Sequence, residues 1–507
     1  MNSPLSANIW TLLFEETAHS GLNLQGRICR MMFSALVQGH LRSGMAVPSS
    51  RELAEQICVG RNTVTIAYQQ LVSERILESR QRSGHFIHPH FYVDSSDPKT
   101  MKTTSQLTQW SHRFAIQPSQ QRHLTKPSDW NSYPFPFIYG QSDPESFPAS
   151  AWRECSIKAL SARDASIWAQ DLTQQGDDAY LINAIRQHIL PTRGIIAREN
   201  EILLTVGSQH ALYMLAALLI RSEHVIGIEE PGYPDARNIF MLHSQNIVAL
   251  PIDDEGMIVS DYTPQCDYFY LTPGRQCPTG VTLSPQRRRN LLQKAEQFDS
   301  IIIEDEYDAQ ILVENTTIPA LKSLDRHGRV IYVGSLSKPL APGLRLGYIV
   351  AAPELIEELR HLRRLMVRHP NVFNQRVFAF FIDQGYYHSM LRRQFQLHRQ
   401  RAEVLLVALK RYLPTWQVSA SNGGSACWIK IPIEIDSTVL ARYAANHGVF
   451  IEAGESFFLS SQQNKHFLRL GFGSIALDKI PEGVQHLAAA VEEYSLYNGS
   501  KDSKLSQ

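Results

Sequence analysis

The chain has 507 residues, more than one hydrophobic core normally holds, which predicts two or three domains. Its 49 lysines and arginines equal its 49 aspartates and glutamates, so any nucleic-acid binding must come from a local basic patch. The six cysteines form no CxxC pair and no dense framework, which excludes a disulfide-stapled scaffold and favours a reducing cytosol. The first residues lack a basic stretch followed by an apolar one, so we expect no signal peptide and a cytoplasmic location.

Composition changes along the chain predict two folded regions joined by a linker. Residues 1–90 carry helical periodicity and a cluster of turn signals. Residues 91–133 are poor in aliphatic side chains and rich in Ser, Thr, Gln, Lys and Pro, which predicts a flexible linker. From 134 to 497, short β-rich runs alternate with longer helical patterns, and 498–507 form a polar tail. Strands alternating with helices predict an α/β domain with a mostly parallel sheet.

The first region contains a helix-turn-helix pattern. Ser49 with Glu52 three residues later forms a capping box, so a helix should begin at Ser50 and run to about Cys58. After a tight turn, a second helix should run from Arg61 to about Glu74. Its inward positions recur at helical spacing: Val64, Ala67, Tyr68 and Leu71. The polar N-terminal end of this second helix is then free to enter the major groove of DNA.

A strand, turn and strand follow over residues 76–87, which predicts a wing. A generic helical domain with solvated arginines is the alternative interpretation. The pattern nevertheless resembles the winged helix-turn-helix of the GntR superfamily along nearly its whole length, from the Leu-Arg-Ser-Gly entry through the Arg-Asn-Thr-Val helix start to the Ser-Gly-His-Phe wing. The resemblance implies these DNA contacts: Arg51, Arg61, Asn62, Thr63, Thr65, Arg82, Gly84 and His85.

Four segments of the larger region carry residue types that a pyridoxal 5'-phosphate (PLP) site needs. These are an amine, an acid for the pyridine nitrogen, and donors for the phosphate. The run Gly334-Ser335-Leu336-Ser337-Lys338, with Arg345 shortly after it, offers the amine, two hydroxyls and a guanidinium. The strand Ile301–Ile303 ends in acids, and Asp305 and Tyr307 share its parity, so both can face one crevice.

The other two segments are weak signals when taken alone. Ser208 and Gln209 follow a strand and open a helix, where backbone N–H groups favour a phosphate. Tyr233 follows a strand and a turn and could stack on the pyridine ring, although a core or surface tyrosine is the more ordinary interpretation.

In this order the segments resemble fold-type I aminotransferases, specifically the aminotransferase-like domain of MocR-type regulators, which is fused behind a GntR-type DNA reader. The resemblance implies a Schiff base at Lys338, a pyridinium partner at Asp305, Tyr307 at the 3'-oxygen and Tyr233 on the ring. It places the following residues around the phosphate: Ser208, Gln209, Ser335, Ser337 and Arg345. It also implies a small C-terminal α/β subdomain and, in Leu-Arg-Leu-Gly-Phe, a carboxylate-binding Arg469 for an acidic effector.

One departure from the family pattern affects the expected chemistry. Aminotransferases usually have asparagine before Pro-Thr-Gly, and here Cys277 takes that place. A thiol is a poor hydrogen-bond donor, so Tyr307 would have to supply more of the hydrogen bonding to the 3'-oxygen. The substitution favours a binding module over an efficient transaminase. Arg237 is a further candidate anion contact in an uncertain register.

Two basic runs and the histidines suggest no further site. The arginines of 287–289 and 360–364 fall in helical patterns, so we expect solvated helix faces there in preference to DNA contacts. The 19 histidines show no persuasive ligand spacing, and we expect no metal.

The sequence thus predicts a PLP-dependent, ligand-responsive transcription regulator. An effector amine or amino acid forms an external aldimine with PLP, and the exchange alters operator binding. The resemblance implies a homodimer that reads an operator with two half-sites. The alternatives are a working PLP-dependent aminotransferase with an accessory DNA-binding domain, and a constitutive DNA-binding protein whose large domain only dimerises. Amino acids, taurine-like sulfonates, ectoine-derived amines and PLP itself all stay open as effectors.

Overall fold

The computed structural model divides by its contacts into two units, Met1–Phe114 and Ala115–Gln507. The structure describes the following residues: 7–18, 20–81, 83–89, 110–141, 143, 146–170, 176–308, 319–419, 424–460 and 464–505.

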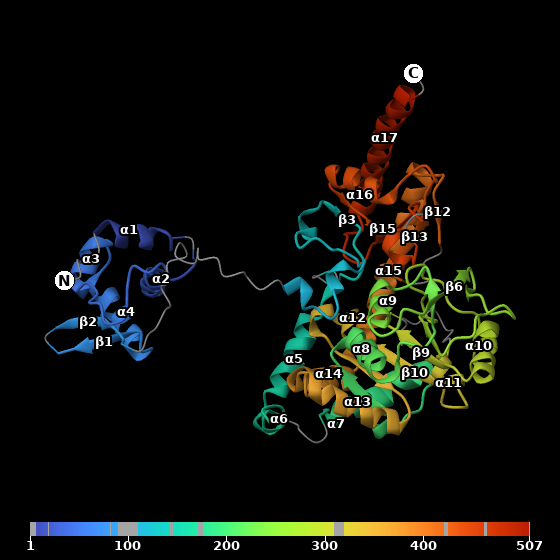
Figure 1. Ribbon diagram of the computed structural model, residues 1–507, viewed down its shortest axis with the longest axis horizontal. Helices are drawn as coiled ribbons and strands as arrows, with labels where there is room; N and C mark the ends of the chain where they lie inside the picture. The colour runs from blue at the N-terminus through green and yellow to red at the C-terminus, as the bar shows by residue number, and fades with distance from the viewer. Residues whose placement is uncertain are drawn as a thin grey trace. The chain divides into compact units, whose positions relative to one another are not determined.

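The first unit is a helical domain with a β-hairpin (Figure 1). Its elements are α1 (Ala7–Glu15), α2 (Leu24–Val37), α3 (Ser50–Gln56), α4 (Arg61–Ser73), β1 (Leu77–Arg80) and β2 (Gly84–Ile87). The two strands pair antiparallel, with Arg80 opposite Gly84 and Leu77 opposite Ile87. The expected helix-turn-helix and wing are therefore confirmed.

Local sequence signals account for these helices. Ser49 caps α3 through its side chain, and Glu52 returns a hydrogen bond to the Ser49 backbone, which is the predicted capping box. All four predicted inward positions of α4 are buried: Val64, Ala67, Tyr68 and Leu71. They pack with α1, α2 and the hairpin into one apolar core.

The second unit is built on an eight-stranded, mostly parallel sheet, with the order β4-β11-β10-β9-β8-β5-β6-β7. The strands are β4 (Ile202–Thr205), β5 (Ile226–Glu230), β6 (Ile247–Asp253), β7 (Gly256–Met257), β8 (Tyr268–Leu271), β9 (Ile301–Glu306), β10 (Val330–Ser335) and β11 (Gly347–Val350). Strands β10, β9, β8, β5 and β6 run parallel. Strand β11 is antiparallel to both of its neighbours, so β4 points the same way as β10. The predicted α/β fold is confirmed.

Helices cover both faces of this sheet, and strand alternation decides which side chains meet them. Leu203, Ile303 and Ile331 pack against one helical layer, which consists of α8 (Gly207–Leu219), α9 (Pro234–Met241) and α13 (Pro353–Met366). Leu204 and Tyr332 point to the opposite layer. That layer contains α5 (Ala149–Ala159), α7 (Ala179–Ala184), α14 (Val372–Asp383), α10 (Pro285–Phe298) and α11 (Leu321–Leu324).

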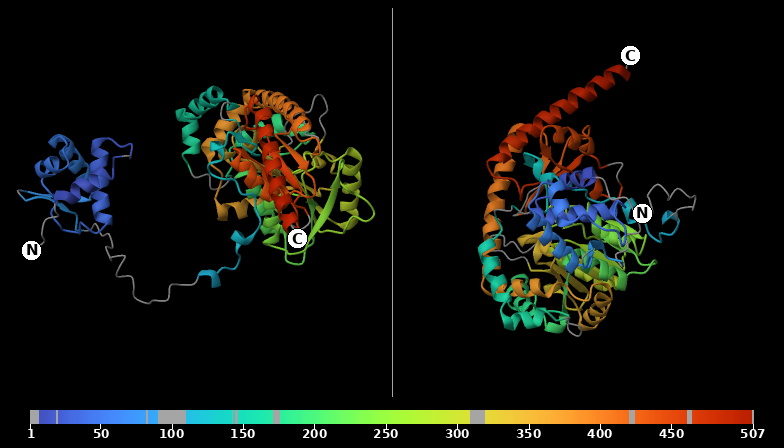
Figure 2. Two further views of the ribbon diagram at one scale, coloured as in Figure 1. Left: turned by 90° about the horizontal axis from the view of Figure 1, so that it is seen from above. Right: turned by 90° about the vertical axis from the view of Figure 1, so that its left-hand side faces the viewer.

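A smaller four-stranded sheet forms the C-terminal part of the second unit, with the order β12-β13-β16-β15. Its strands are β12 (Gln417–Val418), β13 (Ala426–Lys430), β15 (Glu452–Ala453) and β16 (Phe467–Gly471). It packs on α15 (Tyr386–Tyr412), α16 (Ser437–Asn446) and α17 (Lys479–Leu505) through one apolar core. Figure 2 shows α15 and α17 as the two long helices of this unit. The remaining elements are α6 (Ala162–Trp168), α12 (Ser337–Leu340) and the parallel pair β3 (Phe135–Pro136) and β14 (Val449–Phe450).

The expectation of solvated arginine faces is wrong for two residues. Arg288 is 1% exposed and donates to three backbone carbonyl oxygens, those of Leu283, Pro319 and Pro273. Arg363 is fully buried and pairs with Asp177 at 2.6 Å. Buried guanidinium groups are tolerated when each is paired or hydrogen-bonded, so these two arginines tie loops to the sheet.

None of the helices in the described part of the chain combines the length and apolar character that a bilayer span requires.

Replacing Ser49 with alanine should destabilise the first unit by about 1 kcal/mol, because the capping hydrogen bond to the Glu52 amide is lost. Hydrogen exchange of the α3 and α4 amides in the full chain measures this change. Ser83→Ala is the matched control, since Ser83 is an exposed turn serine with only a 3.5 Å contact. Equal protection in both variants would show that the cap adds nothing.

Candidate functional site

The carboxyl ends of five strands of the large sheet meet at one edge. Strands β4, β5, β8, β9 and β10 all point toward it. In open α/β sheets this edge is where ligands bind, because loops from several strands converge there. Each of the four segments identified in the sequence lies at or just after the carboxyl end of one of these strands. The topology of the sheet therefore brings the segments together.

A cavity of about 310 Å³ lies at this edge. It is lined by all nine residues predicted for a cofactor and by the predicted effector residue: Ser208, Gln209, Tyr233, Asp305, Tyr307, Ser335, Ser337, Lys338, Arg345 and Arg469. Sites for small ligands are usually of this size, apolar with a few convergent polar groups.

Lys338 extends from the short helix α12 into the cavity between two aromatic rings. Its Nζ lies 4.1 Å from the centre of the Tyr307 ring and 4.5 Å from that of Tyr139. Burial disfavours the charged form and lowers the pKa of Lys338 to about 8, while the nearby Asp308 carboxylate opposes the shift. A buried lysine of this kind is partly deprotonated near neutral pH and therefore nucleophilic.

Asp305 is the penultimate residue of β9, and it is almost fully buried where it lines the cavity. The Tyr270 hydroxyl donates to its Oδ2 at 2.9 Å, while its Oδ1 has no hydrogen-bond partner among the described residues. Burial raises the pKa of Asp305 to about 7, against the opposing effects of Tyr270 and Lys338. A buried carboxylate with a free oxygen would gain from a cationic partner.

The opposite end of the cavity gathers donors suited to an anion. Gly207, Ser208 and Gln209 open helix α8, where backbone N–H groups and the helix dipole favour negative charge. Gly207 adopts a φ of +76°, and a Cβ there would come within 3.1 Å of the Arg345 guanidinium. Glycine thus keeps Arg345 close to the helix terminus.

The two predicted serines have different local partners. The Ser337 hydroxyl accepts from the Leu346 amide at 3.0 Å and donates to the Leu346 carbonyl oxygen at 3.2 Å. The Ser335 hydroxyl accepts from the Lys338 amide at 3.4 Å. Ser337 therefore braces the loop around Lys338 besides lining the cavity.

Arg469 enters from β16 of the smaller sheet and is 2% exposed. Its Nε donates to Glu452 Oε2 at 2.8 Å, on the neighbouring strand β15. Its Nη2 is buried and has no hydrogen-bond partner in the described chain. Arg469 therefore keeps one donor for a ligand.

Arg237, the further candidate anion contact, is directed elsewhere. Its guanidinium donates to the carbonyl oxygens of Ser456, Phe458 and Arg122, at 3.0, 2.9 and 3.2 Å.

Cys277 lies on the cavity wall beside a cluster of Trp428, Phe457 and Phe458. Burial raises the pKa of its thiol, although Arg469 and Lys338 act in the opposite direction. The thiol is therefore neutral near pH 7, in a position where a stronger hydrogen-bond donor would change the polarity of the wall.

Four residues of this site were not predicted from the sequence. Tyr139 contributes the ring against Lys338, Tyr270 orients Asp305, and Asp235 and Lys126 line the cavity. Tyr270 shares the parity of buried positions in β8, which is a signal for a core tyrosine only. Tyr139 and Lys126 lie outside the predicted strands, and no motif marks them.

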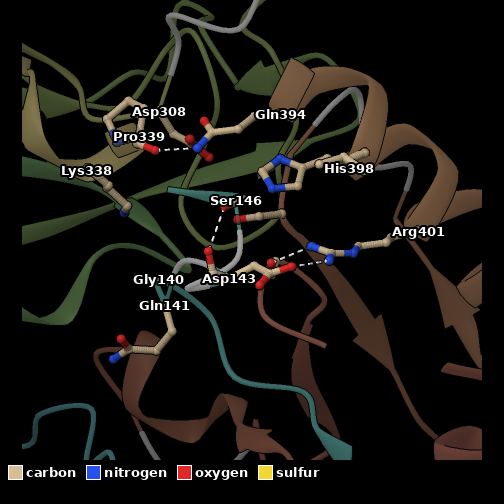
Figure 3. Close-up of a pocket in the computed structure, with 13 residues that line it drawn as sticks. Gly140, Gln141, Asp143, Ser146, Asp308, Lys338, Pro339, Gln394, His398 and Arg401 are labelled. Atoms are coloured by element: carbon tan, nitrogen blue, oxygen red, sulfur yellow. Dashed lines mark hydrogen bonds and ion pairs between the residues drawn. The ribbon is translucent and has the colours of Figure 1, made fainter. Parts of the chain in front are cut away.

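Lys338 also borders a second, smaller cavity (Figure 3). In Figure 3, Arg401 of α15 reaches Asp143, and Gln394 of the same helix donates to the Pro339 carbonyl oxygen at 2.6 Å. His398 lines it as well, and burial lowers the pKa of His398 to about 4, so the ring is neutral. The long helix α15 thus fixes the backbone just after Lys338.

In the first unit, the predicted DNA contacts lie in the first turn of α3, at the start of α4 and in the wing. Arg51, Arg61 and Asn62 are exposed, whereas Thr63 and Thr65 are half-buried. Gly84 is exposed with a φ of +95°, and the His85 ring packs on Tyr68 at 5.0 Å. Arg82 lies outside the described residues.

Comparison with known proteins agrees with both units. The family model for bacterial regulatory proteins of the gntR family matches residues 24–87, and the model for aminotransferase class I and II matches residues 141–487. The aminotransferase class I and II fold is in general PLP-dependent.

The chain resembles curated regulators over nearly its full length. It is 35% identical to the HTH-type transcriptional regulator TauR of Rhodobacter capsulatus, over 92% of this chain and 96% of that one. It is 30% identical to the probable rhizopine catabolism regulatory protein MocR of Rhizobium meliloti, over 90% and 91% of the two chains.

A solved kynurenine aminotransferase of Pyrococcus horikoshii is 26% identical, with a TM-score of 0.67 over 76% of this chain and 98% of that one. With a GntR-type reader, an aminotransferase fold and full-length relatives of this kind, the chain belongs to the MocR-type subfamily of GntR transcription regulators and is a DNA-binding regulator with an aminotransferase-like domain.

Proposed function

We propose that this regulator binds PLP in the 310 Å³ cavity and senses a primary amine that carries an anionic end, which changes its affinity for an operator. The observation that carries the proposal is the convergence of nine predicted cofactor residues and Arg469 on one cavity. They come from five separate segments between residues 208 and 469 of the sequence, so chance clustering is a poor explanation.

The donor set fits PLP at both ends. The free, buried Oδ1 of Asp305 is the acceptor that a protonated pyridine nitrogen requires. The α8 N-terminus and Arg345 offer the phosphate several donors and a positive charge. Tyr233 would stack on the ring, Tyr307 would bond the 3'-oxygen, and Lys338 would supply the amine between these ends.

When bound, PLP supplies a carbonyl carbon that bonds reversibly to primary amines. Lys338 would supply the amine that holds this carbon, and an effector amine would compete with it for the same carbon. Asp305 would favour the protonated pyridine nitrogen, because its negative charge favours the cation. Arg469 selects the effector by its anionic end, using the Nη2 donor that Glu452 leaves free.

The effector can act on DNA binding only through a difference in affinity between two states of the protein. We propose a cytoplasmic homodimer, because two copies of the reader are needed to recognise two half-sites. A working aminotransferase is the alternative function, and sustained production of a keto acid from an amino donor would favour it. The neutral thiol of Cys277 at the cavity wall favours sensing.

The absorption spectrum tests the cofactor. With PLP added, the wild-type protein should show a visible band that Lys338→Ala lacks, because Lys338 is the amine that we propose bonds covalently to the cofactor. Lys430→Ala removes an exposed lysine of β13 and should keep the band. A protein that shows no band after PLP is added would contradict the proposal.

The same sample tests regulation. Amines that shift the band of the wild-type protein should also change its affinity for DNA fragments selected with that protein. An amine that shifts the band and leaves DNA affinity unchanged would refute the coupling.

Capture of PLP by the PLP-free protein should speed up with pH and then level off near pH 8. Burial lowers the pKa of Lys338 to about 8, so the nucleophilic neutral amine increases about tenfold per unit below that value. Stopped-flow absorbance measures the rate constant. A rate that keeps rising to pH 10 would show an ordinary, solvated lysine.

Arg61→Ala should weaken binding to the selected DNA about 5-fold to 150-fold, because an arginine at the start of the recognition helix contributes about 1–3 kcal/mol. Fluorescence anisotropy at fixed salt measures the affinity. Arg30→Ala is the control, since Arg30 is exposed on α2 outside the predicted contacts. An equal loss in both variants would indicate a general charge effect.

A further inference from the structure

A segment just before the matched aminotransferase region contributes side chains to the lining of the cavity. We call residues 117–126 the strap. They fall within the range 91–133, for which the sequence predicts a linker. Arg122 donates to the carbonyl oxygens of Phe458 and Leu459. Arg237 and Asn238 of α9 donate to the Arg122 carbonyl oxygen, at 3.2 and 2.7 Å. The strap is thus held on both sides by the main unit.

Two strap residues reach inward and line the cavity itself. Leu124 packs beside the apolar cluster that contains Cys277. Lys126 directs its ammonium into the cavity, where it donates to the carbonyl oxygen of Tyr139. Its Nζ lies 5.9 Å from the centre of the Tyr139 ring.

Three cationic groups lie around the ring of Tyr139. The Arg469 guanidinium carbon lies 4.0 Å from the ring centre, Lys338 Nζ 4.5 Å and Lys126 Nζ 5.9 Å. Glu452 neutralises Arg469 through their 2.8 Å pair. Among the described residues, Lys126 has no ion-pair partner at contact distance, although the carboxylates of Glu452 and Asp235 favour its charge from farther away.

The carboxylate of Asp235, which also lines the cavity, accepts hydrogen bonds from two other side chains. Asp235 accepts from the Tyr233 hydroxyl at 3.1 Å and from the Gln209 amide at 3.4 Å. Burial lowers the pKa of Lys126, with Arg469 adding to the shift and Glu452 and Asp235 opposing it. Holding a half-buried ammonium beside a guanidinium is unfavourable until an anion arrives.

A structural role for Lys126 would need only a neutral donor to the Tyr139 carbonyl oxygen. The aliphatic stem of lysine can also cover apolar surface. Neither role requires the charge of Lys126, and Lys126 and Arg469 both border the cavity. Lys126 has no ion-pair partner among the described residues, and the buried Nη2 of Arg469 has no hydrogen-bond partner there, so a carboxylate or sulfonate can accept from both groups.

We propose that Lys126 is a specificity-determining residue that binds the anionic end of the effector together with Arg469. The inference rests on the proposed function and extends it: the ligand is a primary amine with a carboxylate or sulfonate at its other end, and the strap contributes one of the two groups that hold it. Since Lys126 is on the strap, the bound anion fastens the chain segment that leads toward the DNA reader.

The test compares charged and uncharged probes in the PLP-loaded, full-length protein. The charged probes are β-alanine and 2-aminoethanesulfonate, and the uncharged probe is β-alaninamide. Titration followed by the cofactor band gives an apparent Kd for each probe. Lys126→Met should weaken the charged probes about 10-fold to 100-fold, because a charge-assisted hydrogen bond is lost. The uncharged probe should change less than about threefold.

Two further variants separate binding from packing. Lys126→Arg should restore most of the affinity for the charged probes, because it keeps the charge. Lys410→Met is the matched control, since Lys410 is exposed in the last turn of α15. Hydrogen exchange supplies an independent readout: a charged probe should slow exchange of strap amides in the wild-type protein and not in Lys126→Met.

The outcomes distinguish the inference from the function on which it rests. If charged probes act on Lys126→Met as they do on the wild-type protein, the inference is wrong and the proposed function stands. An equal loss for charged and uncharged probes would assign Lys126 a packing role and overturn the inference. If no probe changes the wild-type band, amine sensing fails and the inference fails with it.

Discussion

The common direction of five strands is the constraint on which the site depends. Because β4, β5, β8, β9 and β10 end at one edge of the sheet, segments far apart in sequence converge there. A close contact between two backbone segments then positions the hydrogen-bond donors of the α8 N-terminus. A Cβ at Gly347 would lie 2.9 Å from the carbonyl carbon of Gly207, so glycine lets β11 pass beside the α8 terminus.

Burial sets the chemistry of the cavity once the residues have met. It raises the pKa of Asp305 and lowers that of Lys338, which brings both values near the physiological range. The same burial keeps the Cys277 thiol neutral. A cavity with these properties suits reversible covalent capture of an amine. At the position of Cys277, its wall lacks the strong hydrogen-bond donor that the related aminotransferases usually have.

The arginines of this chain show that residue type alone does not define the role of a side chain. Arg288 and Arg363 are fully buried and hold backbone or an aspartate, and Arg237 holds the strap. Arg469 alone among these lines the large cavity and keeps a free, buried donor. A helical pattern cannot separate these cases, because it gives the face of a helix but not what packs against it.

The sequence by itself determined the elements and most of the site. Strand runs, the Ser49 capping box and the inward positions of α4 were predicted correctly, because they depend on local periodicity and capping. The residues predicted for the cofactor converge because the βα alternation visible in the sequence produces parallel strands, whose carboxyl ends lie at one edge of the sheet.

Only the tertiary structure decided which other groups reach the cavity. Tyr139, Tyr270 and Lys126 carry no motif, and their roles arise from contacts across 13 to 35 residues or more. The strap has the composition of a linker, yet Arg237 and Asn238 hold it by side-chain bonds to backbone carbonyls. Such bonds depend on long-range packing, which local propensity does not encode.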